Sequence, residues 1–202
     1  RHNIAHQQPR LRLYETGLSF VSQDNEIKQK RCLSGLLYGS HLDEQWAEKT
    51  RPVDFYDLKG DLESMLSLTG APEAFGFIAE EHSALHPGQS ARILRGEQHV
   101  GWIGLMHPEL EKRLGLKGKA YLFEIELETL ENGRVPAFAP ISRFPRIRRD
   151  LAIVVDRDIT YERVKQVIRN ASPETVRDIR LFDVYAGENI ESHRKSLALS
   201  LI

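Results

Sequence analysis

Three prolines fall within ten positions of the chain, Pro136, Pro140 and Pro145. Proline fixes its own φ angle and has no backbone N–H, so this stretch cannot continue a helix or a central strand. We expect a stiff, extended connection there, and it is the best domain boundary in the sequence. The 202 residues are therefore predicted to form two domains, residues 1–139 and 140–202.

The first domain is predicted to be a mainly antiparallel sheet. Residues 121–128 alternate cleanly: Tyr121, Phe123, Ile125 and Leu127 would face inward, and Glu124, Glu126 and Glu128 would face outward. Further strands are expected over residues 11–20, 32–38, 75–80, 91–95 and 98–105. Many strands with few helices favour an α+β fold over an array of βαβ units.

Two helices are expected among these strands. Asp57 is predicted as the N-cap of an amphipathic helix that buries Leu58, Leu62, Met65 and Leu66 and ends before Gly70. A brief helix over residues 109–114 would follow Pro108 and stop at Gly115.

The second domain has a different order of elements. A β-rich run over residues 151–155 precedes a helix capped by Thr160, and strands are expected over residues 176–185 and 197–201. Val164, Val167, Ile168 and Ala171 are predicted to form the buried face of that helix. Strand–helix–strand–strand is the first two thirds of a ferredoxin-like βαββαβ unit, so we expect a truncated ferredoxin-like (βαββ) domain within a piece of a longer polypeptide.

Bulk composition excludes several classes of protein. With Lys+Arg 28 against Asp+Glu 29, the chain is nearly neutral, so an RNA partner must be held by a local patch. The single cysteine, Cys32, excludes an internal disulfide framework and a cysteine-based zinc site. No run of about 18 apolar residues and no signal peptide occur, so we expect a cytoplasmic protein with no membrane partner.

Two segments near the C-terminal end have the residue types that bind single-stranded RNA. Four arginines lie close to Phe144 in the sequence: Arg143, Arg146, Arg148 and Arg149. The guanidinium of arginine forms bidentate hydrogen bonds with phosphate. Asp183 and Tyr185 stand two apart in an expected strand and would share one face with Leu181. A carboxylate can accept hydrogen bonds from a base edge, and tyrosine can stack on a base. The alternative is a solvated loop whose arginines pair with Asp150 or Asp156, beside a surface Asp–Tyr pair.

Catalytic and metal sites are not expected. His86 and His107 each precede proline, which is more typical of an ordered turn or a helix start than of a catalytic pair. The acidic stretch could hold Mg²⁺, but carboxylates at a helix N-terminus are well explained by capping; it comprises Asp54, Asp57, Asp61 and Glu63. We therefore predict no catalytic residue and no metal ligand on this chain.

A series of short segments resembles the β subunit of bacterial phenylalanyl-tRNA synthetase. They are residues 12–17 (RLYETG), 53–63 (VDFYDLKGDLE), 85–90 (LHPGQS), 107–110 (HPEL), 142–145 (SRFP), 148–151 (RRDL), 181–185 (LFDVY) and 195–198 (KSLA). Any one of these is weak, but the series covers essentially the whole chain in order.

The resemblance implies a fold and a role for each domain. Residues 1–139 are similar to the catalytic-like domain, a class II synthetase-like antiparallel sheet domain without a working active site. Residues 140–202 are similar to the ferredoxin-fold anticodon-binding domain, in which Tyr185 would stack on the first anticodon base, a guanine, and Asp183 would bond its edge. The chain would be a non-catalytic part of a ligase that joins phenylalanine to tRNA.

The resemblance also implies partners and cofactors. They are the catalytic α subunit in an (αβ)₂ heterotetramer, the tRNA anticodon, and ATP with Mg²⁺ for the holoenzyme, with no cofactor bound to this chain. Two other hypotheses stay open: a protein-interaction module with an antiparallel sheet and no RNA role, and a self-sufficient enzyme using His86 or His107.

Overall fold

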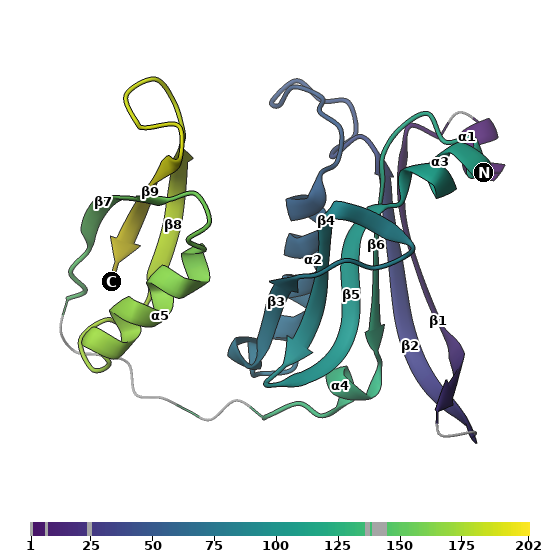
Figure 1. The fold of residues 1–202 in the computed structure, drawn as a ribbon, viewed down its shortest axis with the longest axis horizontal. Coiled ribbons are helices and arrows are strands. Elements are labelled where there is room, and N and C mark those ends of the chain that lie inside the picture. The colour runs from purple at the N-terminus through teal and green to yellow at the C-terminus, as the bar shows by residue number, and fades with distance from the viewer. Residues whose placement is uncertain (1, 7, 24–25, 136–137, 139–144) are drawn as a thin grey trace. The chain divides into compact units, whose positions relative to one another are not determined.

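The chain forms two compact units, Arg1–Ala137 and Phe138–Ile202 (Figure 1). The computed structural model describes residues 2–6, 8–23, 26–135, 138 and 145–202. Each unit has its own sheet, in which every recorded strand pair is antiparallel, with helices outside the sheets. The α+β class with antiparallel sheets is therefore confirmed.

The first unit is a six-stranded sheet in the order β1-β2-β6-β5-β4-β3. Its strands are β1 (Arg10–Gln23), β2 (Glu26–Gly39), β3 (Phe75–Ala79), β4 (Leu85–Arg95), β5 (Gln98–Met106) and β6 (Ala120–Glu126). Its helices are α1 (His2–Ala5), α2 (Phe55–Ser67), α3 (Pro108–Leu114) and α4 (Glu128–Glu131), and Pro72–Ala74 is a 3₁₀ turn. Gly115, at φ 68°, ends α3 in the left-handed conformation, as predicted.

Helix α2 covers one face of this sheet because its leucines recur at helical spacing. Leu58, Leu62 and Leu66 are all but fully buried. They pack in one core with residues of the three central strands, Ile93, Ile103 and Ile125. Burial of this kind contributes about 1.5–3 kcal/mol for each large aliphatic side chain, so this interface is the main source of stability in the unit.

The start of α2 differs from the prediction. Asp57 is not the N-cap; Asp54 is, and its Oδ1 accepts hydrogen bonds from the N–H groups of Tyr56 (2.8 Å) and Asp57 (3.0 Å). In return Asp57 Oδ2 accepts from the N–H of Asp54 at 2.8 Å, which completes a capping box. The helix begins one turn earlier than expected because Val53, just before the cap, is buried in the core.

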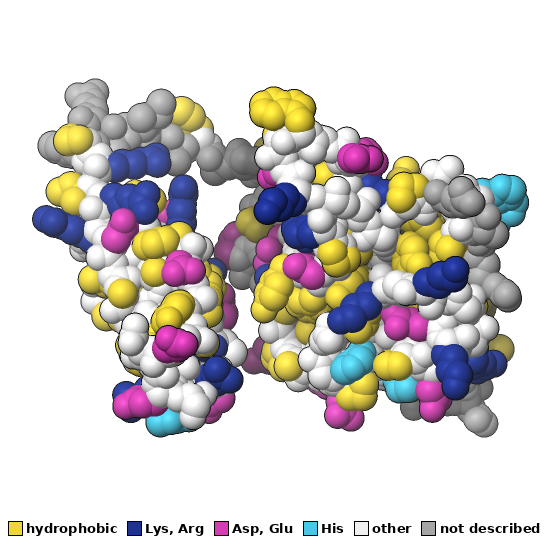
Figure 2. All heavy atoms as spheres, turned by 90° about the horizontal axis from the view of Figure 1, so that it is seen from above, with side chains coloured by type: hydrophobic (Ala, Val, Ile, Leu, Met, Phe, Trp, Pro, Cys, Tyr) yellow, Lys and Arg dark blue, Asp and Glu magenta, His cyan; other side chains and the backbone are white. Residues whose placement is uncertain are grey.

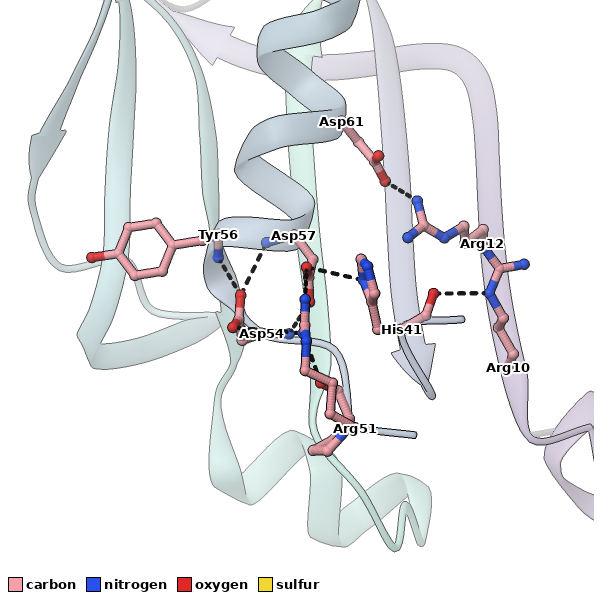
Figure 3. A network of polar contacts seen from close by, with 9 residues as sticks. Arg10, Arg12, His41, Arg51, Asp54, Tyr56, Asp57 and Asp61 are labelled. Atoms are coloured by element: carbon pink, nitrogen blue, oxygen red, sulfur yellow. Dashed lines mark hydrogen bonds and ion pairs between the residues drawn. The ribbon is translucent and has the colours of Figure 1, made fainter. Parts of the chain in front are cut away.

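Asp57 also fixes the loop before the helix (Figure 3). The guanidinium of Arg51 donates to both of its carboxylate oxygens, at 2.6 and 2.7 Å. The ring Nδ1 of His41 lies 3.0 Å from Asp57 Oδ1, and the Asp57 side chain is only 8% exposed. The hydrogen bond from Arg51 is the largest cause that holds the pKa of Asp57 below its ordinary value.

The β1–β2 hairpin is longer than the two strands that the sequence predicts. β2 pairs with β6 only from Cys32 to Tyr38, so residues 18–23 and 26–31 pair only with each other and form an arm beyond the sheet. Tyr14, Leu18, Phe20 and Ile27 are exposed on the face of the hairpin that continues the α2 side. Without a second neighbour this part of the hairpin buries little, so its sequence lacks the apolar run that marks a buried strand.

The second unit is a three-stranded sheet, β7-β9-β8, with one helix. Its elements are β7 (Arg149–Asp156), α5 (Tyr161–Ala171), β8 (Ile179–Tyr185) and β9 (Arg194–Leu201). Thr160 caps α5 as predicted, since its hydroxyl accepts from the N–H of Arg163 at 3.2 Å. Val164 packs against Leu197 and Leu199 of the central strand.

The predicted buried face of α5 is partly wrong. Val167 is 55% exposed and Ala171 is also exposed, while Tyr161 and Ile168 pack beside Val164. A sheet of three strands is narrow, so only the central stripe of the helix reaches it. Among the described residues, no helix has the length and apolar character that crossing a membrane requires.

Substitution Asp57→Asn is expected to lower the free energy of unfolding at pH 7 by about 1–2 kcal/mol, since it disrupts the capping box and leaves Arg51 without a carboxylate. The folded-state pKa of Asp57 is depressed below 3.8. Its stabilisation is therefore complete above that value and is lost as the pH falls through the folded-state pKa. Urea unfolding of residues 1–202 at pH 7 and at lower pH measures both effects.

Asp61→Asn is the matched control on the same helix. Asp61 pairs with Arg12 in an exposed contact, so its loss should cost less than about 1 kcal/mol. The role given to Asp57 is contradicted if Asp57→Asn and Asp61→Asn lower the free energy of unfolding equally. It is also contradicted if the difference in free energy of unfolding between the wild type and Asp57→Asn does not become smaller at acid pH.

Candidate nucleic-acid interface

One face of the small sheet has no helix on it in the described part of the unit. Along β9, Leu197 and Leu199 turn toward α5, whereas Ser196, Ala198 and Ser200 turn to the other side. Directly paired residues share a face, so the same side carries Asp150, Ala152 and Val154 of β7. We call this side, defined by Ser196, Ala198 and Ser200 and the residues paired with them, the open face.

A β-bulge in β8 decides which of its side chains reach the open face. Leu181 pairs with Leu199, but Asp183 pairs with the adjacent residue, Ala198, so Phe182 is an extra residue in the strand. Leu181 consequently packs in the core under α5, while Asp183 and Tyr185 lie on the open face. The prediction that Asp183 and Tyr185 share a face is confirmed, but placing Leu181 with them is wrong because simple alternation fails at the bulge.

Asp183 and Tyr185 are available to a ligand. The carboxylate of Asp183 is exposed and forms no hydrogen bond or ion pair with any other residue that the structure describes. The Tyr185 side chain is 44% exposed, and its ring lies over Gly187. A Cβ added at Gly187 would come within 2.1 Å of the phenolic oxygen, so only glycine lets the ring lie there.

A network of three polar side chains links β7 to β9 on the open face. Arg148 donates to the two oxygens of Asp150 at 2.8 and 3.1 Å, and the hydroxyl of Ser200 donates to Asp150 Oδ1 at 2.6 Å. The hydrogen bond from Arg148, followed by that from Ser200, lowers the pKa of Asp150 from its ordinary value. The same pairing with Asp150 raises the pKa of Arg148, so this pair stays charged at neutral pH.

The guanidinium of Arg148 also lies beside an aromatic ring. Its Cζ is 5.8 Å from the centroid of the Phe182 ring, which places Phe182 on the open face with Asp150. Phe182 is 55% exposed. The open face therefore carries a phenylalanine, the unpaired carboxylate of Asp183, a tyrosine, and two arginines that are each paired with a carboxylate, Arg148 with Asp150 and Arg180 (opposite Ser200) with Asp178.

The predicted arginines do not gather in one place. Arg143 lies outside the described residues, as does Phe144. Arg146 is exposed, and its side chain has no hydrogen bond or ion pair to another described residue. Arg149 stands opposite Leu201 in the sheet and so lies on the α5 side. Of these four arginines, Arg148 is the one that the described residues place on the open face, and it lies there paired with Asp150, the arrangement that the alternative reading anticipated.

The sequence analysis missed the positions of Phe182 and Ser200. The bulge has no local sequence signal, since it depends on how β8 meets β9. The sequence does contain one signal for the uncovered face. In β9, the small residues Ser196, Ala198 and Ser200 alternate with leucines. Small side chains along one side of a central strand indicate a flat, uncovered face.

The two His-Pro segments of the first unit are ordered by hydrogen bonds to the histidine rings. His86 Nδ1 accepts from the N–H of Gly88 at 3.0 Å, and His107 Nδ1 accepts from the N–H of Glu109 at 3.3 Å. His107 is thereby the N-cap of α3, and both histidines order the backbone as the turn interpretation predicted.

The acidic stretch is already paired within the protein. Asp54 and Asp57 cap α2, Asp61 pairs with Arg12 and Glu63 pairs with Lys59. Among the described residues, no group of three or more His, Cys, Asp or Glu side chains is arranged to hold a metal ion. Figure 2 shows basic and acidic side chains interspersed on the face it draws, in keeping with a net charge of -1.

Comparison with known proteins agrees with this division of the chain. Residues 1–127 match the family model described as phenylalanyl tRNA synthetase beta chain CLM domain. The chain belongs to the phenylalanyl-tRNA synthetase β-chain family. Residues 142–202 match the model described as ferredoxin-fold anticodon binding domain, so the open face belongs to a ferredoxin-fold domain, as the order of elements predicted.

Curated relatives support the same family. The chain is 49% identical over 201 residues to the phenylalanine–tRNA ligase beta subunit of Pseudomonas fluorescens, covering 100% of this chain and 25% of the relative. It is 46% identical over 203 residues to that of Nitrosococcus oceani, with 100% and 26% covered. The chain thus spans about a quarter of the length of the curated relatives it matches.

Substitution Gly187→Ala is expected to displace the Tyr185 ring, since the new methyl group would overlap the phenol. NMR chemical shifts of the Tyr185 ring should change, with the fold of the unit retained. Gly17→Ala is the control, because a Cβ at Gly17 meets nothing within 4 Å. An unchanged Tyr185 ring in the Gly187 variant contradicts the packing described here.

Proposed function

We propose that this chain is a non-catalytic portion of the β subunit of a phenylalanine–tRNA ligase. Its second domain binds the tRNA anticodon, and its first domain supports the catalytic α subunit during ATP-dependent attachment of phenylalanine to tRNA. The family match and the names of the relatives support this assignment. The domain limits that we propose are residues 1–139 and 140–202.

The arrangement of Asp183 and Tyr185 is the observation that carries the proposal. A carboxylate without a partner and an accessible ring lie on the same uncovered sheet face, within a ferredoxin-fold anticodon-binding domain. Tyr185 stacks on the first anticodon base, a guanine, and Asp183 accepts from the N–H groups on its edge. Arg143, Arg146, Arg148 and Arg149 are proposed as phosphate contacts, with Arg148 the best placed because it lies on the same face.

Catalysis is assigned to the partner subunit. The first domain is proposed to have a class II synthetase-like core that has no active site of its own. The acidic stretch defined above does not fit a Mg²⁺ site. Asp54, Asp57, Asp61 and Glu63 are each already bonded to backbone N–H groups or to a basic side chain. ATP and Mg²⁺ supply activation of phenylalanine in the holoenzyme, in the cytoplasm, and no residue of this chain is proposed to hold them.

One face of the β1–β2 hairpin, including its arm, is the proposed docking surface for the α subunit in an (αβ)₂ heterotetramer. Tyr14, Leu18, Phe20 and Ile27 expose a line of apolar surface that its own sheet does not cover. Exposed apolar surface of this kind on a water-soluble domain is typical of a protein interface. It also gives the alternative hypothesis, a protein-interaction module without an RNA role, its one structural support.

Tyr185→Ala in the full-length subunit assembled with its partner is expected to weaken tRNA binding by about 1–3 kcal/mol, the cost of losing one base–aromatic stack. Fluorescence titration with an anticodon stem-loop at two salt concentrations measures the affinity. Tyr185→Phe keeps the ring and should bind nearly as well. Loss of phenylalanine activation, measured as pyrophosphate exchange, with normal tRNA affinity counts against the proposal. If the intact subunit shows no salt-dependent binding of the stem-loop, the protein-interaction module is favoured.

Asp183 can be tested through the base that it reads. Inosine lacks the exocyclic amino group of guanine, so an anticodon with inosine first should bind the wild type more weakly by about 1 kcal/mol, one hydrogen bond to a charged acceptor. Asp183→Ala should bind both RNAs equally, because the acceptor is gone. If the wild type and Asp183→Ala prefer guanine over inosine to the same extent, a residue other than Asp183 recognises this base.

A further inference from the structure

Phe182 has no role in the function proposed so far. It is the extra residue of the bulge, it lies beside Asp183 in the strand, and it is 55% exposed. With simple alternation it would point away from Asp183, on the side of the helix. The bulge instead sends a large aromatic ring to the open face, where no described helix covers it.

The ring is held beside an ordered cation. Arg148 is fixed by its two hydrogen bonds to Asp150, which is itself fixed by Ser200. These bonds use two of the five N–H groups of a guanidinium, so three remain for an acceptor. An arginine ordered in advance loses less conformational freedom on binding than a free one, which favours a ligand that brings an acceptor to this point.

Phe182 and Tyr185 lie at separate positions along β8. Phe182 shares with Asp183 the position opposite Ala198, and Tyr185 lies opposite Ser196, two residues along β9. Since a strand rises about 3.3 Å per residue, the two positions are roughly 7 Å apart along the strand. One base cannot stack on both. Two aromatic rings on a single sheet face are what ferredoxin-like RNA-binding sheets use to hold successive bases.

We propose that Phe182 and Arg148 form a second nucleotide position on the open face, which holds the anticodon-loop base next to the one on Tyr185. The base stacks on the Phe182 ring, and the free N–H groups of Arg148 donate to the adjoining phosphate. This inference rests on the proposed anticodon-binding function.

The test uses the full-length subunit assembled with its partner and an anticodon stem-loop with 2-aminopurine at each loop position in turn. Phe182→Leu should weaken binding at least about fivefold, the low end for one lost stack, and should leave the fluorescence of one 2-aminopurine position unquenched. Phe182→Tyr keeps a ring and should restore both affinity and quenching. Thermal unfolding of each variant confirms that the fold is retained.

Val184→Leu is the matched control, since Val184 is 53% exposed in the same strand but pairs with Leu197 and faces the other side. It should leave affinity unchanged. Arg148→Gln should reduce the slope of log affinity against log salt by about 0.7, the value for one phosphate contact with a single strand, whereas Phe182→Leu should leave the slope as it is.

Three outcomes are decisive. Weakening in Phe182→Leu with recovery in Phe182→Tyr supports the second position. If Phe182→Leu behaves like Val184→Leu while Tyr185→Ala still weakens binding, this inference is overturned and the anticodon-binding function stands. If neither Phe182→Leu nor Tyr185→Ala changes affinity, both are overturned.

Discussion

A single helix covers one face of a three-stranded sheet, and the proposed function of the second domain depends on that constraint. Helix α5 buries Val164 against Leu197 and Leu199, which commits one side of the central strand to the core. The other side must then suit water, and β9 meets this requirement with Ser196, Ala198 and Ser200. Small side chains in the middle of this face leave room for a flat ligand between the larger groups on the outer strands.

The bulge in β8 sets the chemistry of that face. In a regular strand without the bulge, Leu181 and Asp183 would share a side, and a leucine would have to leave the core or a carboxylate enter it. The bulge at Phe182 keeps Leu181 under α5 and still turns Asp183 and Tyr185 outward. One irregular residue thus reconciles a folded core with a polar binding face, and it places an aromatic ring there as well.

What the sequence could predict was local. Thr160 as a cap, Gly115 as a helix end and the alternation of residues 121–126 each depend on neighbours in the chain, and the structure confirms them. The alternation does not extend to Leu127 and Glu128 as predicted, because α4 begins there. The cap of α2 was wrong because Asp54 and Asp57 are both good caps, and buried Val53 decides between them. The bulge and the arm depend on how a strand pairs with the next strand along the chain, which the pattern within one strand does not show. For the same reason the cluster of arginines did not predict that Arg148 would lie on the open face and Arg149 on the α5 side.

The charge of the open face favours reading a base over holding a phosphate backbone. The chain has a net charge of -1, and Arg148 and Arg180 on this face are already paired with Asp150 and Asp178, so little positive charge is left to attract RNA at long range. The free carboxylate of Asp183 repels any phosphate that approaches it. It is favourable only opposite hydrogen-bond donors, and guanine presents two adjacent donor groups on its pairing edge. Stacking on the neighbouring rings brings a base within reach without help from charge, and the carboxylate then selects among bases. In the proposed function, Asp183 therefore adds selectivity at some expense to affinity, which is the balance that an anticodon reader needs.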